Sequence, residues 1–114
     1  MAGRVVIFVA HADATSLRLA GSCALAAAAM DDRVDVFLFG SALGAVVAAV
    51  GDAEHPAALL LQAREAGTCR LLGCSASLVS EKVDPAGADA ALDAVVGWPT
   101  VLEWSRGVVD RFFF

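Results

Sequence analysis

Three short segments rich in valine, isoleucine, leucine and phenylalanine constrain the fold of this chain more than any other feature. They are residues 4–10, 34–39 and 68–73. None of them alternates regularly between apolar and polar residues, as a strand with one face in water would. Continuous apolar runs of this length are typical of strands buried on both faces, as in a parallel sheet covered by helices.

The segments between these runs have the spacing of helices. Apolar residues recur every three or four positions from Leu19 to Met30, which predicts a helix over residues 15–30 with Thr15 or Ser16 as its N-cap. Three further helices are expected over residues 41–50, 56–66 and 99–106. Each has a capping serine or a proline at its start and a glycine after its end, in the pairs Ser41 and Gly51, Pro56 and Gly67, and Pro99 and Gly107.

The order of the elements predicts a three-layer α/β/α fold with a mainly parallel sheet of four or five strands. Strands separated by helices need crossover connections, which are right-handed and make the strands parallel. We expect a turn at residues 84–87, a short helix at 88–95 and a last strand at 108–114. A fifth short strand could lie within residues 78–96, but the sequence does not define its position. Residues 1–114 show no repeat or linker, which indicates a single domain.

Charge and hydropathy limit the classes of partner. The net charge is −5 and the 8 lysines and arginines are dispersed, which argues against nucleic-acid binding. The longest uncharged stretch, residues 36–51, is too short to span a membrane, and residues 1–10 lack a signal-peptide pattern, so we expect a cytoplasmic protein. Hydrophobic residues make up 59% of the chain. This surplus indicates either subunit contacts in a homo-oligomer or simply an alanine- and valine-rich composition.

The predicted strands end in three segments that meet at one edge of the sheet, where open parallel sheets bind their ligands. These segments are residues 10–13, 40–41 and 73–75. Cys74 is the candidate nucleophile among them, because a helix that begins just after it would stabilise a thiolate. The alternative is a buried structural cysteine, which is the commoner role of a lone cysteine inside cells.

Other polar residues at this edge are candidates for supporting roles. His11 could act as a base toward Cys74, or it is a loop histidine in solvent. Ser41 and Ser75 lie at the ends of the second and third strands, where they could support Cys74. Asp13 is a weaker candidate, since an aspartate in such a loop often caps the following helix.

The remaining cysteines fit the core. Cys69 precedes Cys74 by about 16 Å of strand and points to the opposite face, so the two cannot form a disulfide while the strand is intact. Cys23 lies on the predicted first helix. The sequence has no zinc-ligand spacing, no phosphate-binding glycine loop and no GxSxG motif, so we expect neither a metal nor a cofactor.

Several aromatic residues lie near the end of the chain. Trp98 and Trp104 do not share one helix face, so we expect one in the core and the other as an interface anchor. The three phenylalanines at residues 112–114 must point to both faces of a strand. They therefore need cover from a helix or a neighbouring subunit.

Five segments together resemble the DsrE/DsrF-like family over nearly the whole chain. The first three are VVIFV at residues 5–9, RLA at 18–20 before the alanine-rich stretch to Met30, and VDVFLFG at 34–40. The others are AGTCRLLGCSAS at residues 66–77, which is similar to the family's third strand and cysteine, and GWPTVLEW at 97–104, which resembles its last helix.

The resemblance implies a small α/β/α domain that assembles into trimers or hexamers. In the family's sulfur-relay members the cysteine that matches Cys74 carries a persulfide, without metal or cofactor, and passes sulfur to a partner protein. Residues 75–77 are closer to an uncharacterised branch of the family, and some members lack the cysteine.

Three functions follow as hypotheses. The first is a sulfur carrier, or sulfurtransferase-like protein, that uses Cys74. The second is a non-enzymatic assembly or small-ligand-binding module, in which the apolar surplus serves subunit contacts. The third is a thiol redox sensor, which would need a resolving thiol from another molecule because Cys69 is badly placed.

Overall fold

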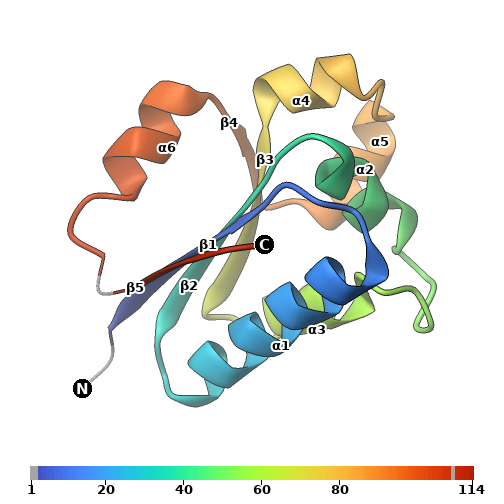
Figure 1. The fold of residues 1–114 in the computed structure, drawn as a ribbon. Helices are drawn as coiled ribbons and strands as arrows, with labels where there is room; N and C mark the ends of the chain where they lie inside the picture. The colour runs from blue at the N-terminus through green and yellow to red at the C-terminus, as the bar shows by residue number, and fades with distance from the viewer. Residues whose placement is uncertain (1–2, 109) are drawn as a thin grey trace.

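The strands form one five-stranded sheet in the order β4-β3-β2-β1-β5, with every neighbouring pair parallel (Figure 1). The structure, a computed structural model, describes residues 3–108 and 110–114. The strands are β1 (Arg4–Val9), β2 (Arg33–Leu38), β3 (Cys69–Cys74), β4 (Ala94–Val96) and β5 (Asp110–Phe113). The parallel sheet predicted from the apolar runs is confirmed.

Helices lie on both faces of this sheet and complete the expected three-layer α/β/α fold. They are α1 (Ala14–Ala29), α2 (Ser41–Ala48), α3 (Ala58–Glu65), α4 (Ser75–Ser80), α5 (Pro85–Ala91) and α6 (Trp98–Trp104). Helices α1, α2, α3 and α5 bury side chains in the larger core cluster, which includes Ile7 and Leu38. Helix α6 packs on the other face, where Val101 joins a smaller cluster with Phe37 and Leu72.

The two faces are unequally covered because of the order of the crossovers. The connections from β1 to β4 all step in one direction, so right-handed crossovers place their helices on one face. The connection from β4 to β5 runs back across the sheet and places α6 on the other face. Because α6 has 7 residues and is about 10 Å long, it cannot cover five strands spaced about 4.8 Å apart.

Close packing of α1 against α3 depends on Gly21. An added Cβ at this position would lie 2.5 Å from the Cβ of Leu59, and its next contacts would be backbone atoms at 3.1 Å. Only a residue without a side chain fits, so Gly21 sets the distance between these two helices. Gly67 has a φ of 86° and follows the end of α3, as the sequence predicts.

The structure corrects several local predictions for the first half of the chain. Asp13, and not Thr15 or Ser16, caps α1, because its Oδ2 accepts a hydrogen bond from the Ser16 N–H at 3.0 Å. Ser41 is the first residue of α2 and Gly40 is its N-cap. Helix α3 begins at Ala58, after a turn, rather than at residue 56.

The prediction of a turn at residues 84–87 is wrong. Asp84 is the N-cap of α5, and Pro85 is at the start of that helix, where its missing N–H costs nothing. The fifth strand, which the sequence could not place, is β4, whose three residues pair with the end of β3.

Candidate functional site

The carboxyl ends of β1, β2 and β3 meet at one edge of the sheet, as the strand assignments predict. The Phe39 N–H donates a hydrogen bond to the carbonyl of Val9 at 2.9 Å, which joins the ends of β2 and β1. The Gly40 N–H donates to the Ser77 Oγ at 2.8 Å. This second bond ties α4 to the loop that begins α2, so the edge is one connected structure.

Cys74 ends β3 and is the N-cap of α4, at the position that the sequence predicts for it. Its side chain is buried, with 5% of the residue exposed. Gly73 pairs with Leu38, so Cys74 is level with Phe39 on the neighbouring strand, and both lie on the face that carries α6. Because α4 has only six residues, its dipole provides less stabilisation of a thiolate than a long helix would.

The three supporting candidates, His11, Ser41 and Ser75, lie at the same edge, and all are exposed. None of them donates or accepts a side-chain hydrogen bond within the described residues. Ser77 links the segments at this edge instead, because its Oγ accepts the hydrogen bond from the Gly40 N–H. No local pattern distinguishes it from its neighbours in the sequence, because its partner is 37 residues away.

The other two cysteines are poor candidates for a thiolate. Burial, with smaller contributions from the charges of Asp93 and Asp35, raises the pKa of Cys69 to about 12. Burial also raises the pKa of Cys23 above its usual value. Cys69 lies in the larger core cluster and Cys23 packs against it, as the sequence predicts. Cys74 is therefore the remaining candidate for thiol chemistry.

A buried charge network, which the sequence analysis missed, holds the face beneath α6. Asp35 is 4% exposed and accepts hydrogen bonds from Arg4 Nη2 at 2.9 Å and Arg70 Nε at 2.8 Å. Burial alone would raise the pKa of Asp35, but the hydrogen bonds and charges of Arg70 and Arg4 lower it below its usual value. The guanidinium carbon of Arg70 also lies 4.6 Å from the ring centroid of Trp104 in α6.

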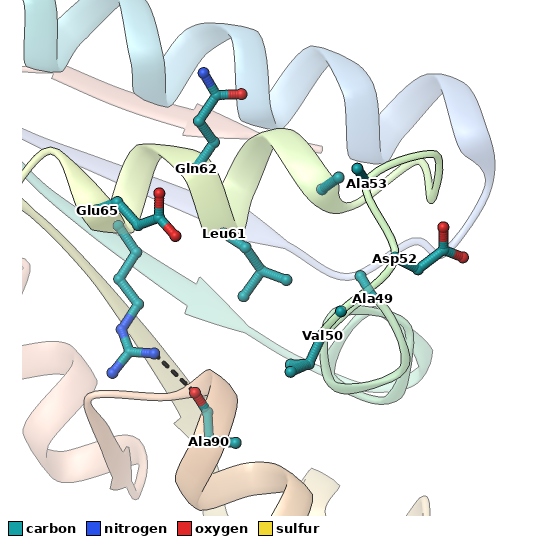
Figure 2. Close-up of a pocket in the computed structure, with 11 residues that line it drawn as sticks. Ala49, Val50, Asp52, Ala53, Leu61, Gln62, Glu65 and Ala90 are labelled. Carbon is teal, nitrogen blue, oxygen red and sulfur yellow. Dashed lines mark hydrogen bonds between the residues drawn. The ribbon is translucent and has the colours of Figure 1, made fainter.

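One hollow of about 630 Å³ lies between the end of α2, helix α3 and Ala90 of α5 (Figure 2). Its lining includes the exposed Val50 and the half-buried Leu61. Arg64 also lines it and donates hydrogen bonds from Nη1 to the carbonyl of Ala90 at 2.9 Å and from Nε to Asp93 Oδ1 at 3.1 Å. None of the predicted site residues lines this hollow, and its one arginine is already paired, so we assign it no function.

A second hollow of about 740 Å³ lies between α6 and the ends of β1 and β5, and we call it the aromatic groove. Its apolar walls are Phe8, Phe39, Trp98, Val101, Leu102 and Phe113. Ala10, Ser105, Arg106 and Arg111 complete its lining. The groove exists because α6 leaves part of its sheet face uncovered.

The exposed aromatic residues that the sequence singled out gather in this region. Trp98 is 55% exposed, whereas Trp104 is half-buried and packs against the smaller core cluster. The role of Trp98 as an interface anchor stays a prediction. Phe113 is 72% exposed and Phe112 is also exposed, whereas Phe114 packs against the larger cluster. Among the residues that the structure describes, no helix covers Phe113.

The described residues, 3–108 and 110–114, contain no group of three or more histidine, cysteine, aspartate or glutamate side chains placed to hold a metal ion. Within the same residues, every helix is too short or too polar to cross a membrane.

Comparison with known proteins identifies the fold. No family model matches the sequence, and no curated protein matches it either. A crystal structure of the ychN protein from E. coli matches with a TM-score of 0.70 over 98% of this chain and 99% of that chain. Only 17% of the residues are identical, so the likeness shows the fold alone. The chain therefore has the fold of the ychN protein over almost its whole length.

Proposed function

We propose that this protein is a carrier of sulfane sulfur, with Cys74 as the persulfide-bearing residue. The observation that carries the proposal is the position of Cys74. It ends β3 at the ligand-binding edge of a parallel sheet, while the other two thiols have raised pKa values. The three-layer fold is also the one that the DsrE/DsrF-like resemblance implies.

The transfer requires two exchange steps and no metal or cofactor. In the first, the Cys74 thiolate bonds to the outer sulfur of a donor persulfide, whose S–S bond breaks, and the donor leaves as a thiolate that takes up a proton. In the second, an acceptor thiolate bonds to the same outer sulfur and Cys74 leaves as a thiolate. Each step exchanges one S–S bond for another, so no external oxidant or reductant is needed.

Access to Cys74 requires local opening, because only 5% of the residue is exposed. Helix α4 suits this role, since it has six residues and none of them is buried. Such a segment can open at a free-energy cost well below that of unfolding the sheet. We propose that α4 moves aside during transfer and closes again over the loaded sulfur.

The proposal also includes a homo-oligomer, a trimer or hexamer, and a cytoplasmic location. The exposed Leu19 and Met30, which lie outside the aromatic groove, and the 59% hydrophobic composition support subunit contacts. Sedimentation velocity of the whole chain tests this part. A species of three or six chains supports it, and a monomer at micromolar concentration contradicts it.

The experiment that tests sulfur transfer is cyanolysis after loading. The protein is incubated with cysteine persulfide, desalted and treated with cyanide, which removes sulfane sulfur as thiocyanate. We expect about one equivalent of thiocyanate from the wild type and from Cys23→Ser, and almost none from Cys74→Ser. Equal release from the wild type and Cys74→Ser would contradict the proposal.

A second function is supported by a separate observation. The low exposure of Cys74 and the open aromatic groove favour a non-enzymatic module that binds a small ligand or assembles with other subunits. In that case Cys74→Ser would have the same properties as the wild type. The cyanolysis result distinguishes the two functions.

A further inference from the structure

The strand order of the sheet reverses between β1 and β5. From β1 the chain adds β2, β3 and β4 on one side, and α6 then returns it to the other side of β1, where β5 pairs. In open parallel sheets, ligands bind outside the carboxyl ends of the strands at the point of reversal. The aromatic groove lies at this point, since Phe8 and Ala10 are at the end of β1 and Phe113 is at the end of β5.

Four aromatic rings form a continuous row along this groove. Phe113 stacks on Phe8 with ring centroids 4.9 Å apart, Phe8 stacks on Phe39 at 6.2 Å, and Phe39 stacks on Trp98 at 5.0 Å. The planes of neighbouring rings differ by 10° to 20°. Leu102 of α6, which is 58% exposed, faces the same groove. The walls thus offer a rigid, apolar and largely aromatic surface to an apolar ring.

The charged residues that line the groove are both arginines. Arg111 is held by a hydrogen bond from its Nη2 to the carbonyl of Ser105 at 2.8 Å, and Arg106 is exposed. Within the described part of the chain, no aspartate or glutamate lines the groove, although the whole chain carries a net charge of −5. Guanidinium groups at the border of an apolar site favour a ligand with an acidic group.

We propose that the aromatic groove binds a small amphipathic anion, an apolar ring compound with one carboxylate or similar acidic group. The ring lies against the aromatic row and Leu102, and the acidic group lies near Arg106 and Arg111. The volume of about 740 Å³ suits a small organic molecule. Cys74 does not line the groove, so this binding does not depend on sulfur transfer.

The charges of the lining arginines also indicate whether this ligand or a second copy of the chain occupies the groove. A twofold pair built on the groove would bring the arginines of both copies into one apolar interface. The lining residues contain no carboxylate to balance those charges. A small anion balances them directly, so it is the better occupant.

The test uses 2-naphthoate and its neutral isostere 2-naphthamide, titrated into the full chain labelled with nitrogen-15. We expect saturable binding of both compounds, with shifts of the Trp98 indole N–H and of the backbone of α6 and β5. The acid should bind at least about fivefold more tightly than the amide, because of its charge-assisted hydrogen bonds. Equal affinities, no saturable binding, or shifts that lie elsewhere would overturn the proposal.

Three variants make the result specific. Arg106→Gln should lower the affinity for naphthoate to near that for naphthamide and leave naphthamide binding unchanged. Arg18→Gln, an exposed arginine on α1, is the matched control and should change neither affinity. Leu102→Glu places a carboxylate in the groove at an exposed position and should weaken the binding of both compounds. If Arg106→Gln and Arg18→Gln behave alike, the acidic group is not bound in the groove.

Two further outcomes complete the test. Cys74→Ser should bind both compounds as the wild type does, which separates this inference from the sulfur-carrier proposal. Sedimentation velocity with and without naphthoate should show the same species. Dissociation of an oligomer by naphthoate would show that a second copy occupies the groove, and would overturn the proposal.

Discussion

At the scale of single residues, Cys74 combines a suitable position with low exposure. It lies at the edge of the sheet formed by the carboxyl ends of the strands, but with 5% of the residue exposed it offers little direct access to a donor persulfide. The Gly40–Ser77 hydrogen bond holds α4 in place next to it. Under the proposal that α4 moves aside during transfer, the reactivity of Cys74 depends on how easily α4 opens.

Replacing Ser77 should make Cys74 more reactive. Ser77→Ala removes the bond to the Gly40 N–H, and one such bond contributes about 0.5–1.5 kcal/mol, so opening should become about two- to tenfold more frequent. The measurement is the rate of alkylation of Cys74 by iodoacetamide in the native protein. Ser80→Ala, at the exposed end of the same helix, is the control, because its one side-chain hydrogen bond, from Oγ to the Ser77 carbonyl, is exposed and long at 3.4 Å, so the rate should change by less than about twofold. An unchanged rate in Ser77→Ala would show that α4 does not control access.

Asp35 should make stability depend on pH in the acid range. Because its pKa is lowered in the folded protein, the stability that Asp35 contributes is present above its usual value of 3.8, and is lost as the pH falls through the folded pKa. Asp35→Asn should lower the free energy of unfolding at pH 7 by about 2 kcal/mol. This loss in the free energy of unfolding is smaller than the loss from breaking a fully buried ion pair, because Arg4 and Arg70 are still partly exposed to water.

Urea denaturation of the wild type and Asp35→Asn between pH 3 and pH 7 measures this effect. The difference between the two proteins should shrink toward the acid end of the range. Asp89→Asn, at an exposed position in α5, is the control and should change stability by less than about 0.5 kcal/mol. A constant difference across this range would contradict the proposed role of the Asp35 charge.

At the scale of elements, the packing of α1 against α3 can be tested at Gly21. Gly21→Ala should destabilise the fold by about 2 kcal/mol, because the added Cβ meets Leu59 at 2.5 Å and the surrounding backbone cannot easily move. Gly44→Ala in α2 is the matched control, since no atom lies within 4 Å of the added Cβ. It should stabilise the fold by about 0.5–1 kcal/mol. Thermal unfolding of both variants measures these opposite effects, and destabilisation by both would contradict the packing argument.

Most elements could be predicted from the sequence because their signals are local. The strands β1, β2 and β3 are continuous apolar runs, and the glycine that follows α3 marks its end. Strand β4 could not be located, since its three residues form a strand only by pairing with β3. The prediction of a turn before α5 failed because Asp84-Pro85 suits both a turn and a helix start.

The candidate site was only partly predictable, because most of its contacts join segments that are far apart in the sequence. The position of Cys74 follows from the end of β3, which is a local signal. The burial of Cys74, the bond from Gly40 to Ser77 and the network around Asp35 depend on strands brought together across the sheet. No spacing within one segment reports such contacts.

At the scale of the whole molecule, the direction of the crossovers explains the uneven surface. One reversal in strand order leaves a single short helix on one face, and this produces the aromatic groove beside β1 and β5. Alternation along β3 from Leu72 places Cys74 on the same face, but Cys74 does not line the groove. The fold therefore separates two features that could each carry a function.

The measurement that most directly tests the central claim is mass spectrometry of the persulfide-treated protein, first intact and then by peptide. We predict a gain of one sulfur atom, about 32 Da, that a reductant removes and that maps to the peptide containing Cys74. Cys74→Ser should show no gain, and Cys23→Ser should show the gain of the wild type. A gain that persists in Cys74→Ser, or no gain in the wild type while Cys74 also resists alkylation, would contradict the account of Cys74 as a sulfur carrier.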